Sequence, residues 1–239
     1  MQYGPQAAEA DLEFFVPSEC ARRVSQGRSD LGIVPVAEMA RLGWESLPGT
    51  GIACRGEVRS ILLVSRVEPR LIRTLAADSG SRTSVRLARI VLAERYGASP
   101  GTFEHPPGLD EMLAQADAAL LIGDAALAVE PTALPYYCLD LGTEWLALSG
   151  KPMVFALWAG TAPALDRFDR ARLAALFRGS LDYGLGRIDD VVASESGERR
   201  MDPALVHRYL THYIHYRIGE EELAGLAAYL RLSAMLPSV

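Results

Sequence analysis

The stretch IRTLAADSGSRTSVRLARIVLAERYG, residues 72–97, joins an apolar strand pattern to a helical one. Residues 72–78 predict a strand, and residues 84–97 place apolar side chains on one broad helical face that Gly97 closes. The turn between them carries four hydroxyls and one guanidinium, those of Ser79, Ser81, Thr83, Ser84 and Arg82. A strand that passes directly into a helix predicts an α/β fold.

The same succession recurs toward the N-terminus. Residues 12–17 (LEFFVP) predict a buried strand, and Ser18 is the expected N-cap of the helix that follows. Residues 31–34 predict a second strand, after which Pro35 interrupts the pattern before another short helix. This alternation is typical of a parallel sheet covered by helices. Further strands are expected at 51–67, 118–122 and 151–160, a turn-rich loop at 98–108, and helices alone from residue 168 onward.

The pattern predicts two α/β lobes. Residues 76–157 are expected to form lobe 2, and the flanking segments 1–75 and 158–239 a discontinuous lobe 1. Strands near 58–67 and 152–159 are expected to join the lobes as a hinge. A cleft between two such lobes is a common place for a small-molecule site.

Composition narrows the class of protein. The chain of 239 residues is long enough for one large domain or two lobes, and its formal net charge of −6 argues against a nucleic-acid partner. The three cysteines, Cys20, Cys54 and Cys138, lack zinc-site spacing and predict reduced thiols in a cytoplasmic protein. The sequence also lacks the roughly 18-residue apolar run of a transmembrane helix and the pattern of a signal peptide. We therefore expect a cytoplasmic protein without a membrane partner.

The turn ahead of residue 84 is the first candidate site. A helix N-terminus offers free N–H groups and a partial positive charge, which favour an anion. The hydroxyls of Ser81, Thr83 and Ser84 would add donors suited to a carboxylate. The alternative, in which Ser79 or Ser81 only caps the helix and Arg82 faces water, stays open.

Four further residues, Gly123, Asp124, Ser18 and Ser60, belong to the candidate binding site. Gly123 and Asp124 follow the predicted strand 118–122, where a glycine lets a ligand approach the main chain and a carboxylate stands beside it. Asp124 is alternatively a helix cap. Ser18 and the junction 34–36 would face one crevice if both preceding strands were parallel, and Ser60 would point a hydroxyl into the cleft or sit on a strand edge.

The histidines favour a structural interpretation. His207, His212 and His215 are expected on one C-terminal helix, interleaved with tyrosines, and metal binding there would need a further ligand. That helix either supports a homodimer or closes the core of one lobe. His105 is a weak candidate for a general acid or base. Because nucleophile-elbow, P-loop and dinucleotide motifs are also missing, the sequence favours a small carboxylate ligand over a nucleotide.

Several blocks together resemble a known family. In chain order they are PSECARRVSQGRSDLGIVPVAE, RSILLVS, DSGSRTSVRLARIVLAERYG, LLIGDAAL and YCLDLGTEWLALSGKPMVFALWAG. They are similar to the chorismate dehydratases of the futalosine route to menaquinone, over residues 15–232. The resemblance implies a two-lobed fold like that of type II periplasmic binding proteins, with a central cleft. It also implies cytoplasmic loss of water from chorismate to give 3-[(1-carboxyvinyl)oxy]benzoate, a lyase reaction, without a metal or organic cofactor.

The chain departs from the family pattern at three places. The family's N-terminal strand and Tyr-Leu-Asn turn, whose asparagine lies in the active site, have no counterpart, so no catalytic residue is carried over. Either the sequence starts inside a longer product or this wall of the site is missing. Gly80 and Val36 stand where many relatives carry hydroxyls. Two other functions stay open: a non-catalytic binding protein for a small aromatic carboxylate, and the dihydroxynaphthoate synthase of the same pathway.

Overall fold

The computed structural model describes residues 4–78, 80 and 82–236, and it divides the chain into two compact units. Unit 1 comprises Met1–Ala53 and Phe155–Gly219, and unit 2 comprises Cys54–Val154 and Glu220–Val239. The sequence predicts that residues 54–75 and 220–239 belong to lobe 1. In the structure both segments belong to unit 2, for the packing reasons given below.

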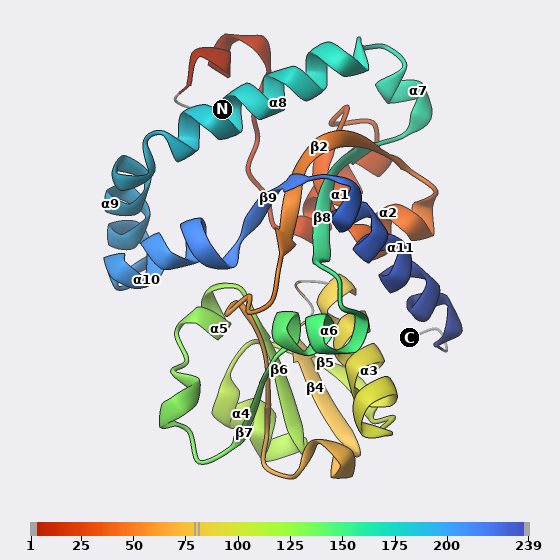
Figure 1. Ribbon diagram of the computed structural model, residues 1–239, viewed down its shortest axis with the longest axis vertical. Coiled ribbons are helices and arrows are strands. Elements are labelled where there is room, and N and C mark those ends of the chain that lie inside the picture. Colours follow the sequence, from red (N-terminus) through yellow and green to blue (C-terminus); the bar gives the residue numbers. More distant parts are fainter. Residues whose placement is uncertain (1–3, 79, 81, 237–239) are drawn as a thin grey trace. The chain divides into compact units, whose positions relative to one another are not determined.

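Unit 1 contains a four-stranded sheet with the order β1-β8-β2-β9 (Figure 1). β1 pairs with β8 and β2 pairs with β9, both antiparallel. The elements that contribute to this unit are η1 (Pro5–Glu9), α1 (Pro17–Ser25), β1 (Gly32–Pro35), α2 (Val36–Leu42), β2 (Glu45–Cys54), β8 (Met153–Gly160), α7 (Ala162–Leu165), α8 (Arg170–Leu185), α9 (Ile188–Arg199), α10 (Pro203–Arg208), the π-helical turn η4 (Tyr209–Tyr213) and β9 (His215–Ile218).

Three expectations for unit 1 are wrong. Residues 12–16 form no strand, and α1 begins at Pro17 with Val16 as its N-cap, so Ser18 is the second helical residue and does not cap the helix. Proline is favoured at this first position because its fixed φ suits a helix. An N–H at this position would have no partner within the helix, so its absence from proline costs nothing. Without the strand at 12–17, the premise that placed Ser18 and the 34–36 junction at one crevice fails. The predicted C-terminal helix is interrupted as well, because β9 pairs with β2 and takes His215 into the sheet.

Unit 2 contains a five-stranded sheet with the order β5-β4-β6-β3-β7 (Figure 1). β4 is parallel to β5 and β6, whereas β3 is antiparallel to β6 and β7, so the sheet is mixed rather than parallel throughout. Its elements are β3 (Ile61–Ser65), η2 (Pro69–Leu71), β4 (Thr74–Asp78), α3 (Arg82–Tyr96), β5 (Gly101–His105), α4 (Leu109–Gln115), β6 (Ala118–Ile122), α5 (Asp124–Leu127), η3 (Pro131–Ala133), β7 (Tyr137–Asp140), α6 (Leu141–Ser149) and α11 (Glu220–Met235).

Helices cover both faces of this sheet because its central strands are apolar on both sides. Alternate residues of β3, β4 and β6 pack with α4 in one buried cluster, among them Leu62, Ala76 and Leu121. The residues between them, such as Leu63 and Leu75, are equally buried and face the other way. β3 is buried at all five positions, which is typical of a central strand, so residues 61–65 lie within this sheet.

Polar contacts hold α11 to unit 2. Glu222, which is only 1% exposed, pairs with Arg55 at 2.6 Å, and Arg86 on α3 donates to the carbonyl of Leu236 at 2.9 Å. Between these points the ring of Tyr229 meets Trp145 of α6 edge to face at 6.2 Å. A helix anchored at both ends and packed in the middle belongs to the unit on which it packs, although it is distant in sequence.

Candidate functional site

One edge of the unit 2 sheet collects most of the predicted site residues. β4 and β6 are parallel, with Ala77 opposite Leu120, so their carboxyl ends lie at the same edge. β3 runs the other way, and its first residue, Ile61, is opposite Ile122. The start of β3 therefore lies where β4 and β6 end. The carboxyl ends of parallel strands are where ligands bind in open α/β sheets.

The segment after β4 supplies the first group of side chains. Thr83 and Ser84, in the first turn of α3, are buried, whereas Arg82 is exposed. Ser79 and Ser81 lie outside the described residues. Behind this turn the Tyr229 hydroxyl donates to the main-chain carbonyl of Thr83 at 3.2 Å, which ties α11 to the first turn of α3.

The segment after β6 supplies main chain with free space in front of it. Gly123 has φ +62° and ψ −134°, and among the described residues, apart from its chain neighbours, no atom lies within 4 Å of a Cβ built at this residue. Its N–H donates to the carbonyl of Ser60 at 2.8 Å, which joins the end of β6 to the start of β3. Asp124 is exposed at the first position of the short helix α5. A glycine with open space in front is suited to close approach by a ligand.

In the turn before β3, residues 58–60, the sequence predicts only Ser60 as a site residue. Ser60 is 5% exposed, and its N–H donates to the carbonyl of Val58 at 2.7 Å. Arg59, at the centre of this turn, has φ +63°, in the left-handed region that residues with a side chain rarely adopt. A three-residue turn with a positive central φ is strained, and such strain gathers at functional sites.

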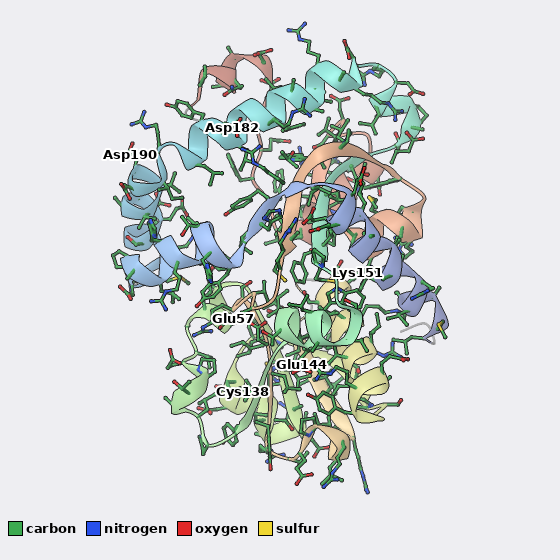
Figure 2. All side chains as sticks on the ribbon, viewed as in Figure 1. Glu57, Cys138, Glu144, Lys151, Asp182 and Asp190 are labelled. Atoms are coloured by element: carbon green, nitrogen blue, oxygen red, sulfur yellow. The ribbon has the colours of Figure 1, made fainter. Side chains whose placement is uncertain are left out.

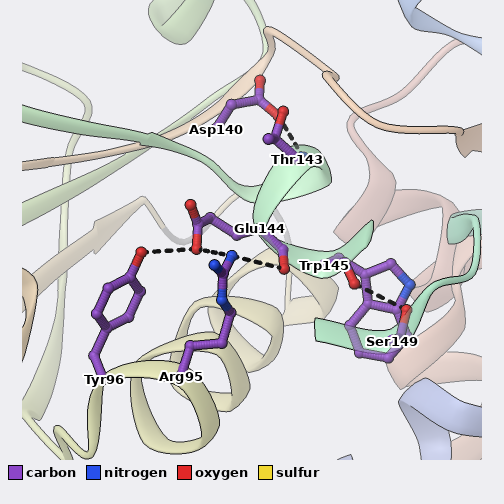
Figure 3. A network of polar contacts seen from close by, with 7 residues as sticks. All are labelled: Arg95, Tyr96, Asp140, Thr143, Glu144, Trp145 and Ser149. Carbon is purple, nitrogen blue, oxygen red and sulfur yellow. Dashed lines mark hydrogen bonds and ion pairs between the residues drawn. The ribbon is translucent and has the colours of Figure 1, made fainter. Parts of the chain in front are cut away.

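Asp140, at the end of β7, holds this turn in place. Its carboxylate accepts from the N–H groups of Val58 at 3.0 Å and Arg59 at 2.6 Å. It also accepts from the Thr143 N–H at 2.9 Å and so caps α6 (Figure 3). The chain passes close by at Gly142, where a Cβ would lie 2.2 Å from the Gly56 carbonyl. One carboxylate therefore joins the start of β3, the end of β7 and the start of α6.

Two thiols lie near this edge, but neither is activated. Burial, followed by the charge of Asp140, raises the pKa of Cys54 to about 12. Burial also raises the pKa of Cys138 on β7, and the charge of Arg59 opposes that change only in part. A raised pKa keeps a thiol protonated and therefore a poor nucleophile. Thiol chemistry is not favoured here.

A second polar network stabilises the packing of α3 on α6. Glu144 accepts from Arg95 at 2.5 Å and from the Tyr96 hydroxyl at 2.9 Å (Figure 3). Burial raises the pKa of Tyr96, and the neighbouring Glu144 carboxylate adds to the rise. Figure 2 places Glu144 on α6 and Cys138 on β7 of the same unit. Because Arg95 and Tyr96 lie in the last turn of α3, this network is structural rather than part of the edge.

Unit 1 contains a cavity of different chemistry. Its volume is about 690 Å³, and aromatic and aliphatic side chains such as Ile33, Trp158 and Phe177 form most of its wall. The charged residues that line it, among those the structure describes, are Arg187, Asp190 and Glu195. Figure 2 labels Asp190 on α9. Because acidic side chains outnumber basic ones on this wall, it does not favour a ligand that carries two carboxylates. None of the predicted site residues, Ser18 of unit 1 included, lines the cavity.

The histidines do not gather into a metal site in the described residues. His212 lies in the π-helical turn and His215 in β9, so the two do not share a helix face as expected. His105 ends β5, where a loop was expected, and its ring contacts Gln115 at 3.0 Å. Within residues 4–78, 80 and 82–236, no three histidine, cysteine or acidic side chains form a group that would hold a metal ion. Over the same residues no helix combines the length and apolarity needed to cross a membrane.

Comparison with known proteins identifies the family. Residues 3–235 match the family described as menaquinone biosynthesis. The chain belongs to this family. A chorismate dehydratase from Thermus thermophilus is 32% identical over 234 residues, which cover 90% of this chain and 83% of that protein. The resemblance found in the sequence is therefore confirmed at the level of the family.

Solved structures of other proteins share the fold of this member of the menaquinone biosynthesis family. Protein AF1704 from Archaeoglobus fulgidus has a TM-score of 0.70 at 16% identity, and the match covers 98% of this chain and 91% of that one. The periplasmic aliphatic sulphonate binding protein SsuA from Escherichia coli has a TM-score of 0.63 at 14% identity, with coverage of 94% and 75%. The fold is thus that of periplasmic binding proteins, as expected, and identities this low carry no more than the fold.

Proposed function

We propose that this protein is a chorismate dehydratase, a lyase that removes water from chorismate to give 3-[(1-carboxyvinyl)oxy]benzoate in menaquinone biosynthesis. The observation that carries the proposal is the 32% identity to a chorismate dehydratase over 90% of the chain. The same identity favours the dehydratase over the dihydroxynaphthoate synthase of that pathway. We place the reaction in the cytoplasm and assign it no metal or organic cofactor. A homodimer stays a prediction.

The edge of the unit 2 sheet is the proposed substrate-binding site. The first turn of α3 would hold one substrate carboxylate through its main-chain N–H groups and the hydroxyls of Thr83 and Ser84, because a helix N-terminus and hydroxyl donors both favour an anion. Ser81, which precedes α3 in the sequence, stays a predicted third donor. Gly123 leaves room for the substrate against the main chain. We also include Ser60, Arg82 and Asp124 among the substrate-binding residues of this edge. Ser18 belongs to unit 1 and stays a separate prediction from the sequence.

The proposed reaction does not need a strong nucleophile from the protein. A ring C–H bond and the neighbouring C–OH bond break, the ring becomes aromatic, and the hydroxyl leaves as water with the abstracted proton. Aromatisation drives the reaction, so positioning and electrostatic stabilisation are the protein's main contributions. We propose that the enolpyruvyl carboxylate of the substrate is the base. Exchange of the ring proton with solvent in a substrate analogue that lacks this carboxylate would contradict that role.

The test is incubation of the purified chain with chorismate, followed by mass spectrometry for loss of one water. Formation of the carboxyvinyloxy-benzoate supports the proposal. Absence of turnover together with a thermal shift on adding the product supports a non-catalytic binding protein instead, and absence of both contradicts the assignment altogether.

Two substitutions test the location of the site. Thr83→Val and Ser60→Ala each remove one hydroxyl, and we expect each to lower kcat/KM about 10-fold, the equivalent of one lost hydrogen bond of about 1.4 kcal/mol. Thr102→Val is the matched control, since Thr102 lies on the edge strand β5 and donates locally to the Pro100 carbonyl at 3.4 Å. If all three variants lose activity equally, the site is not at this edge.

A further inference from the structure

Arg59 has three unusual features that its position before a strand does not require. It is only 7% exposed, it has φ +63°, and it lies between two residues joined across it by the 2.7 Å bond from Ser60 N–H to Val58 carbonyl. A glycine would take this conformation without strain, yet the sequence has an arginine here. Strain of this kind persists only where surrounding contacts enforce it.

The enforcing contact on the main chain is Asp140. Its two oxygens accept from consecutive N–H groups, Val58 at 3.0 Å and Arg59 at 2.6 Å. Hydrogen bonds to an ionised acceptor are about twice as strong as those between neutral groups. The carboxylate therefore fixes the direction in which the Arg59 side chain leaves the turn.

The Arg59 guanidinium extends to the segment that follows β6. Nη1 donates to the Ala126 carbonyl at 2.9 Å, and Nη2 donates to the Val129 carbonyl. Ala126 lies near the end of α5, and its carbonyl also accepts from the Val129 N–H at 3.2 Å. Arg59 Nη2 also lies 3.9 Å from the carboxylate of Glu130, a side chain that is largely exposed. The side chain thus fastens the 123–129 segment to the turn at 58–60, beside the 2.8 Å bond from Gly123 N–H to the Ser60 carbonyl.

We propose that Arg59 is a positioning residue that acts with Asp140. Asp140 holds Arg59 in its strained conformation, and Arg59 holds the Gly123 segment at a fixed separation from Ser60 and from the first turn of α3. Both anchors belong to unit 2 and act on the same sheet edge. The inference rests on the proposed function, because it assigns to that edge the geometry in which chorismate is bound.

The test compares two arginines at opposite ends of the same strand. Arg59 precedes β3 and donates to carbonyls after β6, whereas Arg66 follows β3 and donates to the Ala116 carbonyl before β6 at 3.0 Å. Arg59→Met and Arg66→Met both remove a guanidinium that bonds to main-chain carbonyls. We expect Arg59→Met to lower kcat/KM for chorismate at least 30-fold, mainly through kcat, and Arg66→Met to change it less than twofold.

A second measurement does not depend on turnover. In the full chain, amide hydrogen exchange followed by mass spectrometry should be faster over residues 123–129 in Arg59→Met and unchanged there in Arg66→Met. Arg59→Lys keeps the charge but reaches only one carbonyl, so its exchange and kcat should lie between those of the unmodified chain and Arg59→Met. Arg59→Gly removes the backbone strain together with the guanidinium, and it replaces Arg59→Met if that variant fails to fold.

The outcomes separate the two proposals. Faster exchange over 123–129 together with lower kcat supports Arg59 as a positioning residue. Unchanged exchange, or faster exchange with kcat/KM within twofold of the unmodified chain, overturns it. If the unmodified chain does not act on chorismate, the proposed function fails, and the exchange comparison alone decides whether Arg59 fixes the 123–129 segment.

Discussion

Gly123 combines a positive φ with open space beside its main chain, as Gly27, Gly43, Gly97 and Gly150 also do, and among these it alone is a predicted site residue. Its φ of +62° disfavours any side chain, and a Cβ would enter empty space in front of the main chain. We therefore expect Gly123→Ala to lose about 1–2 kcal/mol of unfolding free energy and about 10-fold in kcat/KM for chorismate. Urea denaturation and steady-state kinetics measure the two effects.

Gly97→Ala separates strain from function. Gly97 follows α3 with φ +66° and also has no atom within 4 Å of a Cβ, but it lies beyond the far end of that helix. The control should lose similar stability and keep full activity. Equal losses of activity in both variants would show that the Gly123 effect is only a folding effect.

At the residue scale, spacing in the sequence predicts which residues gather at one edge of the unit 2 sheet but not which of them contact one another. Thr83, Ser84 and Gly123 were predictable because each follows a recognisable strand, and the topology of the sheet brings such positions together. Arg59 and Asp140 carry no local signal, since the bond between them spans 81 positions in the chain. The positive φ of Arg59 is a tertiary effect that no pattern of neighbouring residues predicts.

At the scale of elements, close approach decides where α6 lies. A Cβ on Gly142 would be 2.2 Å from the Gly56 carbonyl and 2.7 Å from the Cys54 sulfur. Gly142→Ala should therefore push α6 away from the segment before β3 and cost about 1–3 kcal/mol, as overpacking does. Thermal and urea unfolding of the variant measure the loss.

Gly197→Ala provides the opposite expectation on another helix. Gly197 lies inside α9 with no atom within 4 Å of a Cβ, so alanine should stabilise the helix by about 0.5–1 kcal/mol. A neutral Gly142→Ala would mean that the close contact at Gly142 does not fix the position of α6. A destabilised Gly197→Ala would mean that helix propensity does not decide the effect of alanine in α9.

The sequence pattern predicts an element correctly where it continues over many residues and fails where it covers only a few. α3 is predictable because its apolar face continues over about four turns and Gly97 directly follows its last residue, Tyr96. The turn-rich sequence at 98–108 predicts a loop, whereas β5 forms within it through pairing with β4. The apolar segment at 12–16 shows the reverse, since a strand pattern without a partner makes no strand.

At the scale of the molecule, the two edges of the unit 2 sheet serve different purposes. The edge at the ends of β4 and β6 carries the proposed site, and the opposite edge carries a contact that depends on pH. There Asp117, just before β6, accepts from the Arg73 and Thr74 N–H groups, each at 3.0 Å. These bonds, first the one from Arg73, hold the pKa of Asp117 below its usual value.

The direction of this shift fixes the pH dependence. A carboxyl with a lower pKa in the folded state binds protons less readily there than in the unfolded chain, so it stabilises the fold above its unfolded pKa near 4. That contribution is lost as the pH falls through the folded pKa. Asp117→Asn should therefore lower the unfolding free energy by about 1 kcal/mol at pH 7, the size of one hydrogen bond, and by progressively less below pH 4.

Urea denaturation of the unmodified chain and Asp117→Asn at several pH values between 7 and 3 tests this expectation. Because Asp117 lies at the edge opposite to Ser60 and Gly123, kcat per folded molecule at pH 7 should be the same in both proteins. A stability difference that stays constant down to pH 3 would show that the carboxyl ionises alike in folded and unfolded chains. A change in kcat at pH 7 would instead mean that the two edges of the sheet are coupled, so that strand ends far from the hydroxyls also set the geometry of the proposed site.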